Sequence, residues 1–256
     1  MRNFNTYQIN LEKSLKDKLF FVKHINLKDY DLIVDFGCGT GIVINELKRL
    51  TNKLGTNPTL IGYDQNDEMI NFCNDKYDGI HFTNNLNEIK QSLLHYKNKL
   101  IIFSSVLHEM KEYDQIEVIG YIMPLFDTIV IRDMKRPLNN VPIPNRTRRR
   151  VLNQVAKWQA DMFEKRWGKI RDKYNLYRFF LMNEFVDNFV TEVEEDYFGV
   201  SWSQIDWTMD DEGYKMLYGS SYTLPYRAKQ VKMRFNHVMN DITHREVIYI
   251  KEKDNE

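Results

Sequence analysis

The stretch VDFGCGTG, residues Val34 to Gly41, decides the fold of this chain. It ends an apolar run at 31–36 and places three glycines at alternate positions, and a segment with helical periodicity, IVINELKRLTNKL, follows at 42–54. Each glycine costs backbone entropy on folding, so three within five residues indicate a tight turn or a backbone that a ligand approaches closely. The pattern predicts a buried strand, a sharp loop and a helix whose N-terminal N–H groups are free to bind a ligand.

The same order of elements continues along the chain. Short apolar runs predict further strands at 59–64, 79–84, 99–105 and 127–134, and segments of helical periodicity lie between them. Two late stretches, 214–225 and 245–253, also have the pattern of strands, and a helical stretch separates them. Strands that alternate with helices imply crossover connections and a parallel sheet, which binds ligands at the carboxyl ends of its strands.

Bulk composition narrows the class of protein. The 256 residues suit one large domain or a domain with a sizeable insertion, and the 36 basic and 36 acidic residues leave no net charge that would attract a polyanion. The two cysteines, Cys38 and Cys73, form no metal-binding or disulfide pattern, so we expect reduced thiols and no metal. The polar first ten residues and the lack of a run of 18 apolar residues lead us to expect a soluble, cytoplasmic protein with no membrane partner.

The spacing of the glycines indicates which nucleoside-bearing ligand the loop binds. In a dinucleotide-binding fingerprint, G-x-G-x-x-G, the third glycine lies three positions after the second, where this chain has Ile42. The chain instead has glycines at every second position, and Asp64 ends the second strand, where a carboxylate accepts hydrogen bonds from two ribose hydroxyls.

Together, VDFGCGTG and IGYDQN (61–66) resemble the first two motifs of the class I S-adenosylmethionine-dependent methyltransferases. Asp35, Gly37, Gly39 and Gly41 match the acidic-x-G-x-G-x-G signature of that family. The resemblance implies an α/β fold with a doubly wound, mostly parallel seven-stranded sheet, an antiparallel last strand and a helical insertion before the last two strands. It also implies S-adenosylmethionine as the cofactor and methyl transfer as the reaction.

The resemblance implies three segments and a set of roles. Residues 1–136 would be the cofactor-binding Rossmann-like core, 137–213 a helical insertion that acts as a lid or recognises the substrate, and 214–256 the two final strands. The expected contacts are the backbone of Gly37, Gly39 and Gly41 with the methionine part and ribose, Asp35 with the loop and amino group, Asp64 with the ribose, and Gln65 with the adenine. Cys38, Ser104 and Ser105 are the remaining residues expected to contact the cofactor. The acid that often holds the adenine amine is missing from HFTNN (81–85), so Asn84 or Asn85 would replace it.

The stretch FSSVLHEM (103–110) marks the end where the acceptor would enter, because the fourth strand ends beside the glycine loop. His108 is the candidate general base, and Glu109 or Asp133 would orient it. A structural alternative is that His108 and Glu109 cap the next helix and that the serines satisfy backbone groups at the strand end. The Asn/Asp-Pro-Pro-aromatic motif of amino-nitrogen methyltransferases is absent, which weighs against that class of acceptor.

Charge is unevenly distributed in the second half of the chain. There are 13 basic and three acidic residues from 135 to 178, but nine acidic and no basic residues from 187 to 212. Arg146, Arg148, Arg149 and Arg150 are the densest basic cluster and would bind phosphates, with nearby aromatic side chains as stacking platforms. In the alternative interpretation the basic and acidic helices pair with each other and the aromatic residues form a core, as expected for Phe179, Phe180, Phe185 and Phe189.

These patterns leave three functions open. The first is methyl transfer to RNA or to a nucleotide-like acceptor that carries a phosphate, with His244 at the start of the last strand as a further substrate contact. The second is methyl transfer to a neutral small metabolite, with the insertion as a lid. The third is a regulatory subunit that binds S-adenosylmethionine without turnover.

Overall fold

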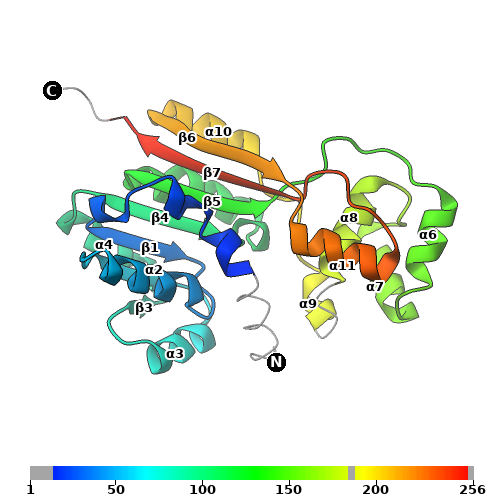
Figure 1. Ribbon diagram of the computed structural model, residues 1–256, viewed down its shortest axis with the longest axis horizontal. Helices are drawn as coiled ribbons and strands as arrows, with labels where there is room; N and C mark the ends of the chain where they lie inside the picture. The colour runs from blue at the N-terminus through cyan, green and yellow to red at the C-terminus, as the bar shows by residue number, and fades with distance from the viewer. Residues whose placement is uncertain (1–13, 184–187, 253–256) are drawn as a thin grey trace. The chain divides into compact units, whose positions relative to one another are not determined.

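The computed structural model describes residues 14–183 and 188–252. Its strands form a seven-stranded sheet in the order β3-β2-β1-β4-β5-β7-β6 (Figure 1). The strands are β1 (Leu32–Phe36), β2 (Thr59–Tyr63), β3 (His81–Thr83), β4 (Lys99–Ser104), β5 (Thr128–Met134), β6 (Tyr214–Tyr222) and β7 (His244–Lys251).

The helices connect these strands in the predicted order. The α-helices are α2 (Ile42–Lys53), α3 (Asp67–Lys76), α4 (Leu86–Ser92), α5 (Glu112–Glu117), α6 (Asn145–Leu152), α7 (Lys157–Trp167), α8 (Lys173–Met182), α9 (Phe189–Glu192), α10 (Trp202–Asp211) and α11 (Pro225–Phe235). Short 3₁₀ or π turns are η1 (Phe20–Lys23), η2 (Leu27–Asp29), η3 (Leu93–His95), η4 (Leu107–Glu109), η5 (Val118–Ile122) and η6 (Met123–Leu125). In the described ranges, no helix has the length and apolar character that crossing a membrane requires.

Backbone pairing confirms the mostly parallel sheet with an antiparallel last strand. The pairs β1–β2, β1–β4, β2–β3 and β4–β5 are parallel. At one end of β5 and β7, Lys251 N donates to Asp127 O, and at the other end Lys135 N donates to Thr243 O. The partner numbers therefore rise along β5 as they fall along β7, which makes this pair antiparallel. Glu252 N with Gly213 O and Thr243 N with Tyr222 O give the same result for β7 and β6.

Burial on the sheet explains why the apolar runs lack alternation. All five residues of β1 and all seven of β5 are buried, as expected for strands with helices on both faces. Ile33, Leu100, Ile102 and Val130 share one hydrophobic cluster with residues of α2 and η1. Residues two apart in a strand point to the same face, so this cluster identifies the face that α2 covers.

The described residues divide into two compact units. The sheet unit contains 14–133, 201–219 and 246–252, and the helical unit contains 134–183, 188–200 and 220–245. These boundaries differ from the expected segments, because α10 belongs to the sheet unit and α11 to the helical unit. The expected insertion at 137–213 thus contributes to both units.

The helical unit has a core of its own. Phe179, Phe180 and Phe189 are buried in it, together with residues of α6, α7 and α11. These three phenylalanines therefore have the core position that their helical spacing indicated. Phe185, which was expected to join them, lies outside the described residues.

Candidate active site

The glycine loop has the backbone conformation that requires glycine. Gly37, Gly39 and Gly41 have φ values of 77°, 51° and 71°, which lie in the left-handed region that other residues rarely adopt. A Cβ atom added at Gly37 would lie 2.3 Å from Val106 Cγ2, so this glycine also lets the loop after β4 approach the loop after β1. The backbone conformation therefore requires all three glycines, and Gly37 also allows the close contact between the two loops.

Hydrogen bonds fix the loop against the end of β2. Gly37 N and Cys38 N both donate to Tyr63 O, at 2.7 and 2.8 Å. Gly39 N donates to one oxygen of Asp64 at 2.9 Å, and Asn66 N donates to the other oxygen at 2.9 Å. Asp64 is half-buried, and these two hydrogen bonds hold its carboxylate from two sides. Each carboxylate oxygen still has a lone pair that can accept a hydrogen bond from a ligand.

The residues expected to hold the adenine lie beyond Asp64 in the same unit. Gln65 is exposed, two residues after the end of β2. The exposed Asn84 donates its amide to Asp67 at the start of α3, and Asn85 caps α4 by accepting the N–H of Asn87. The side-chain oxygen of Asn85 caps a helix, whereas that of Asn84 does not.

Cys38, within the glycine loop, and Cys73, which contacts the loop, are both buried free thiols. Cys73 Sγ donates to Gly39 O at 3.2 Å. A hydrogen bond with Cys73, together with burial, raises the pKa of the Cys38 thiol. Cys38 therefore remains protonated at neutral pH and supports the loop as a small apolar group rather than as a nucleophile.

Asp35 and Lys18 are an acidic and a basic group placed together under the loop. Asp35 is 2% exposed, and its Oδ2 has no hydrogen-bond partner in the described structure. Burial raises the pKa of Asp35 to about 7, against the attraction of Lys18. Burial, followed by repulsion from Arg132, lowers the pKa of Lys18 to about 8, and its Nζ lies 3.5 Å from Ser104 O. Both charges are thus poorly solvated at this end of the sheet.

Sequence reasoning missed Lys18. It is one of several lysines in the helical segment 11–29, and nothing in the spacing distinguishes it from solvent-facing neighbours. The adjacent residue, Asp17, accepts a hydrogen bond from Arg132 Nε at 2.6 Å. This long-range contact, between residues 115 positions apart, brings Lys18 to the end of β4, and a single sequence carries no signal for it.

The end of β4 is tightly held. Ser104 is 5% exposed, and its Oγ has no hydrogen-bond partner in the described part of the chain. Ser105 has a φ of 61°, an unusual conformation for a residue with a side chain. Arg132 fixes it from both ends, since Arg132 Nη1 donates to Ser105 Oγ at 2.7 Å and Ser105 N donates to Arg132 O at 2.8 Å. Strain of this kind persists only where the surroundings enforce it, and it concentrates at functional sites.

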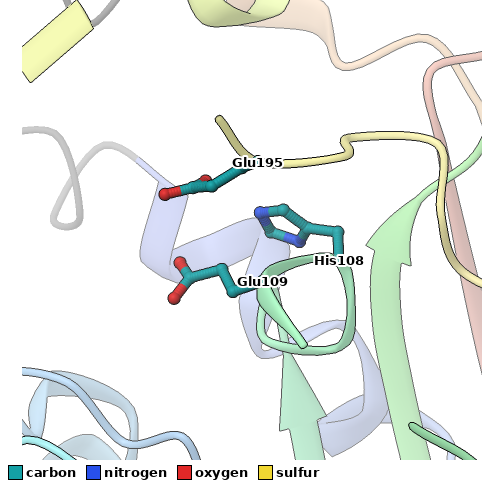
Figure 2. Close-up of side chains that lie close together, drawn as sticks. All are labelled: His108, Glu109 and Glu195. Atoms are coloured by element: carbon teal, nitrogen blue, oxygen red, sulfur yellow. The ribbon is translucent and has the colours of Figure 1, made fainter. Parts of the chain in front are cut away.

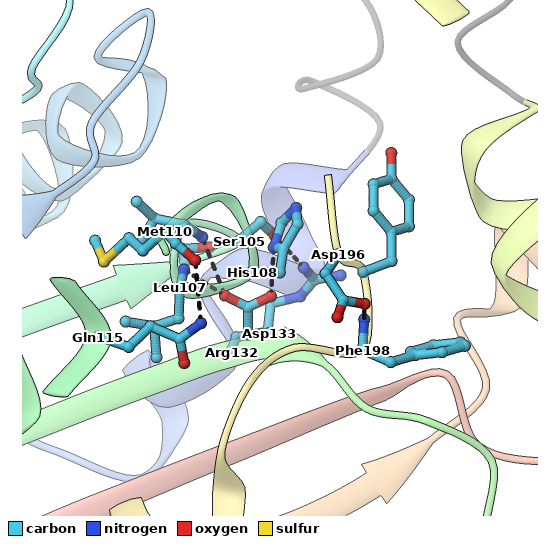
Figure 3. Close-up of polar contacts among 12 residues, drawn as sticks. Ser105, Leu107, His108, Met110, Gln115, Arg132, Asp133, Asp196 and Phe198 are labelled. Atoms are coloured by element: carbon cyan, nitrogen blue, oxygen red, sulfur yellow. Dashed lines mark hydrogen bonds and ion pairs between the residues drawn. The ribbon is translucent and has the colours of Figure 1, made fainter. Parts of the chain in front are cut away.

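His108 and Asp133 form a close pair beside this turn (Figure 3). His108 Nδ1 lies 2.6 Å from Asp133 Oδ1, and Asp133 is fully buried. The other oxygen, Asp133 Oδ2, accepts Val106 N at 3.1 Å and Leu107 N at 2.8 Å. The carboxylate is therefore fixed by two backbone donors. When Nδ1–H of the neutral imidazole donates to it, the lone pair is on Nε2.

This geometry places Asp133 in the orienting position that the sequence left open between Asp133 and Glu109. Both His108 and Glu109 project from η4 directly after β4 (Figure 2). Arg132 and Asp133 are both buried and both reach groups at the end of β4, although strand alternation favoured only one of them. A histidine oriented by a buried carboxylate can take a proton through Nε2.

The expected substrate contacts lie in the helical unit. Arg146 and Arg149 are exposed on α6, and Arg148 is half-buried and forms a 2.5 Å ion pair with Glu164. His244 is 2% exposed, and its Nδ1 lies 2.9 Å from Thr243 Oγ1. Arg148 and His244 therefore have partners inside their own unit.

Two further arginines of the helical unit enclose an aromatic ring. The guanidinium groups of Arg166 and Arg178 lie 4.3 and 4.1 Å from the Trp167 ring centroid. Both also form ion pairs with acids of the stretch 187–212, Arg166 with Glu194 and Arg178 with Asp196. These ion pairs agree with the alternative interpretation of the sequence, in which the basic and acidic segments pair with each other.

No family model matches the chain, and no curated protein matches it in sequence. Solved structures are similar to it in fold. The (4+2)-cyclase SpnF has a TM-score of 0.51 and 11% identity, over 94% of this chain and 82% of SpnF. An O-methyltransferase family protein from Burkholderia thailandensis has a TM-score of 0.51 and 11% identity, over 98% of this chain and 60% of that protein.

The plantazolicin methyltransferase BpumL, solved with a monoazolic desmethylPZN analogue and SAH, has a TM-score of 0.50 and 15% identity, over 98% of this chain and 88% of BpumL. The chain spans about half the length of other neighbours, such as LepI in complex with SAM, of which 46% is covered at 12% identity and a TM-score of 0.47. The strand order, the antiparallel β7 and the similarities with TM-scores of 0.50 and 0.51 identify the class I S-adenosylmethionine-dependent methyltransferase fold.

Proposed function

We propose that this protein is an S-adenosylmethionine-dependent methyltransferase that uses His108 as a general base on an RNA or nucleotide-like acceptor that carries a phosphate. The observation that carries the proposal is the fixed His108–Asp133 pair at 2.6 Å, in the loop that contacts the glycine loop at Gly37. The fold alone does not fix the reaction, because one structural neighbour is a cyclase.

The residues around the glycine loop fit the amino-acid end of S-adenosylmethionine, which is a zwitterion. The unpartnered Oδ2 of Asp35 would pair with the ammonium group, and Lys18 would pair with the carboxylate. Each pairing would restore the charged form that burial disfavours. The Ser104 hydroxyl, also without a partner in the described structure, is a further hydrogen-bonding group at this place.

The remaining expected contacts involve the nucleoside. Asp64 would accept hydrogen bonds from the ribose hydroxyls, and Gln65 and Asn84 would border the adenine. The cofactor, when bound, supplies a methyl group on a sulfonium, which is already activated for displacement. The protein's own contribution is therefore alignment and the removal of a proton from the acceptor where one is present.

His108 would remove that proton. Its Nδ1–H bond to Asp133 fixes the ring and stabilises the imidazolium that forms when Nε2 takes up a proton. The two backbone donors hold the Asp133 carboxylate in place. An acceptor hydroxyl needs such a base, whereas an acceptor whose atom has a free lone pair and no proton to lose does not.

The charge of α6 supports a phosphate on the acceptor. Arg146 and Arg149 are exposed cations, and no carboxylate lies within ion-pair distance of either in the described part of the chain. The ion pair of Arg148 with Glu164 favours the second candidate function, a methyltransferase for a neutral small metabolite, because it neutralises one of the arginines of α6. A binding protein without turnover remains the third candidate.

An assay of methyl transfer tests the proposal. The whole chain is incubated with S-adenosylmethionine that carries an isotope-labelled methyl group, separately with cellular RNA and with a small-molecule extract. The proposal predicts label in RNA or in phosphate-bearing molecules, and loss of that label with the His108→Ala variant. Label in neutral metabolites alone would support the second candidate, and no label in either fraction would support the third.

A further inference from the structure

One buried guanidinium holds the segment before β1 against the end of the sheet. Arg132, in β5, is 2% exposed, and its Nε donates to Asp17 Oδ2 at 2.6 Å, while Nη2 pairs with the same oxygen. Its Nη1 donates to Ser105 Oγ at 2.7 Å (Figure 3). All three residues belong to the sheet unit. Arg132 therefore joins Asp17 to the strained turn after β4 through directional, charge-assisted contacts.

Lys18 follows Asp17 directly, but its own contacts are weak. Lys18 Nζ lies 3.5 Å from Ser104 O, at the limit of a hydrogen bond. Within residues 14–183 and 188–252, no carboxylate lies within ion-pair distance of this ammonium group. A lysine has a long, flexible side chain that normally turns its charged end towards water. The contact of Asp17 with Arg132, rather than any strong contact of its own, therefore keeps Lys18 at the end of β4.

Stability of the empty protein does not account for this arrangement. Asp17 neutralises Arg132, whereas the half-buried Lys18 has no such partner. Burial and then repulsion from Arg132 lower the pKa of Lys18 to about 8, so its charged form is disfavoured here. A carboxylate group of a ligand beside Lys18 Nζ would offset both effects.

Two polar atoms provide an independent observation at the same end of the sheet. Asp35 and Ser104 are 2% and 5% exposed, and Asp35 Oδ2 and Ser104 Oγ have no hydrogen-bond partner in the described part of the chain. Buried polar atoms are normally paired, because the loss of water costs free energy. A cation, an acid and a hydroxyl that all lack strong partners indicate a polar ligand that carries both charges.

We propose that Arg132 is a positioning residue, which holds Asp17 and thereby places Lys18 to bind a ligand carboxylate at the end of β4. The inference rests on the proposed function, in which this carboxylate belongs to the amino-acid end of S-adenosylmethionine. Nε, Nη1 and Nη2 of Arg132 contact Asp17 and Ser105, so Arg132 acts through Lys18 and does not itself touch the cofactor. Ligands that lack the amino-acid end should therefore be insensitive to the Asp17–Arg132 pair.

Titration calorimetry of the whole chain with two ligands tests this role. S-adenosylhomocysteine and 5′-methylthioadenosine both contain adenosine and a thioether, but only the first has the amino-acid end. We expect Lys18→Met and Asp17→Ala each to weaken binding of S-adenosylhomocysteine roughly tenfold or more, because the charge-assisted contact is lost. Binding of 5′-methylthioadenosine should stay within about twofold, and this retained affinity verifies that each variant is folded.

Three further variants sharpen the test. Lys16→Met is the matched control, because Lys16 is exposed two residues before Lys18, and it should bind both ligands normally. Asp17→Glu keeps the carboxylate that Arg132 holds and should retain most of the affinity. If Asp17 acts through Lys18, adding Asp17→Ala to Lys18→Met should weaken binding of S-adenosylhomocysteine by less than about twofold.

The possible failures separate this inference from the proposed function. Equal losses for the two ligands in Asp17→Ala, or additive losses in the double variant, would overturn the positioning role and leave the cofactor proposal standing. Unchanged binding of S-adenosylhomocysteine in either single variant would do the same. No binding of either ligand by the native chain would overturn both proposals. Asp17→Asn, which keeps the size of the side chain and removes its charge, replaces Asp17→Ala in every comparison if that variant does not fold.

Discussion

At the scale of single residues, the most consequential pair is Asp35 and Lys18. Both lie where the chain would place the amino-acid end of its ligand, and both have pKa values shifted towards the neutral form. A buried charge without full solvation lowers the free energy of unfolding. In the proposed function, these residues would bind the ligand at the expense of the stability of the empty protein.

We predict that Asp35→Asn is more tolerant of rising pH than the native chain. The folded pKa of about 7 lies above the usual value of 3.8, so the contribution of Asp35 to stability is fully present below pH 4 and is lost as the pH rises through 7. Relative to the native chain, Asp35→Asn should gain roughly 1–4 kcal/mol in free energy of unfolding between pH 5 and pH 8. Urea unfolding of both proteins at the two pH values measures this, and parallel pH profiles would contradict it.

His108 and Asp133 should act as a unit. His108→Ala should lower turnover by about 100-fold or more while leaving cofactor affinity nearly intact. Asp133→Asn should lower turnover because it disturbs the orientation of the imidazole, and the double variant should be no worse than His108→Ala alone. Single-turnover rates of the four proteins measure the coupling. Additive losses would show that the two residues act independently, and His95→Ala, at an exposed histidine, is the control.

At the scale of elements, the contact between the glycine loop and the loop after β4 would link the proposed cofactor site to the proposed acceptor site. Gly37 makes this contact possible, because a side chain there would collide with Val106. This link predicts that a change at Gly37 affects more than the local backbone.

Gly37→Ala should destabilise the protein more than Gly55→Ala. The two glycines have similar φ values, 77° and 71°, but a Cβ atom at Gly55 would have nothing within 4 Å. Gly55→Ala should therefore cost only the backbone strain, about 1–2 kcal/mol, and Gly37→Ala should cost that amount plus the collision with Val106. Urea unfolding compares them, and equal losses would mean that the two loops can separate without cost.

Elements were also the level at which the sequence was most informative. The apolar runs before Gly37 and Asp64 predicted β1 and β2, and periodicity predicted α2, because each depends on local pattern. The roles of Lys18 and Arg132 depend on a contact across 115 positions, which leaves no local pattern. The boundaries between the two units had no signal in the sequence, because the chain passes from one unit to the other inside β6 and β7 rather than at a linker.

At the scale of the whole molecule, the numbers of acidic and basic residues are equal, but the two kinds of charge are concentrated in different segments of the chain. Ion pairs such as Arg148–Glu164 and Arg178–Asp196 neutralise part of the positive charge of the basic segment within the helical unit. The exposed arginines of α6 remain available for a polyanion. Salt dependence separates these two uses of charge, because exposed phosphate contacts are screened and partly buried ion pairs are screened less.

If RNA is the acceptor, its affinity should fall steeply as salt rises. Replacing Arg149 with glutamine should flatten the log–log slope by about 0.7, the value for one phosphate contact on a single strand. Arg148→Gln should instead lower the melting temperature, because it leaves Glu164 without its partner. Filter binding across a salt series and a melting curve measure both. An unchanged slope in Arg149→Gln would remove this residue from RNA binding.

The central claim is that the loop from Gly37 to Gly41 and Asp64 bind S-adenosylmethionine, and calorimetry of the cofactor with the whole chain tests it most directly. We predict saturable binding by the native chain and a loss of roughly 30-fold or more in Asp64→Ala, because that change removes the charge-assisted bonds to the ribose. It also removes the carboxylate that holds Gly39 N. Glu68→Ala, which removes an exposed carboxylate four residues away, should bind normally. No binding by the native chain, or equal affinity in Asp64→Ala, would contradict the account.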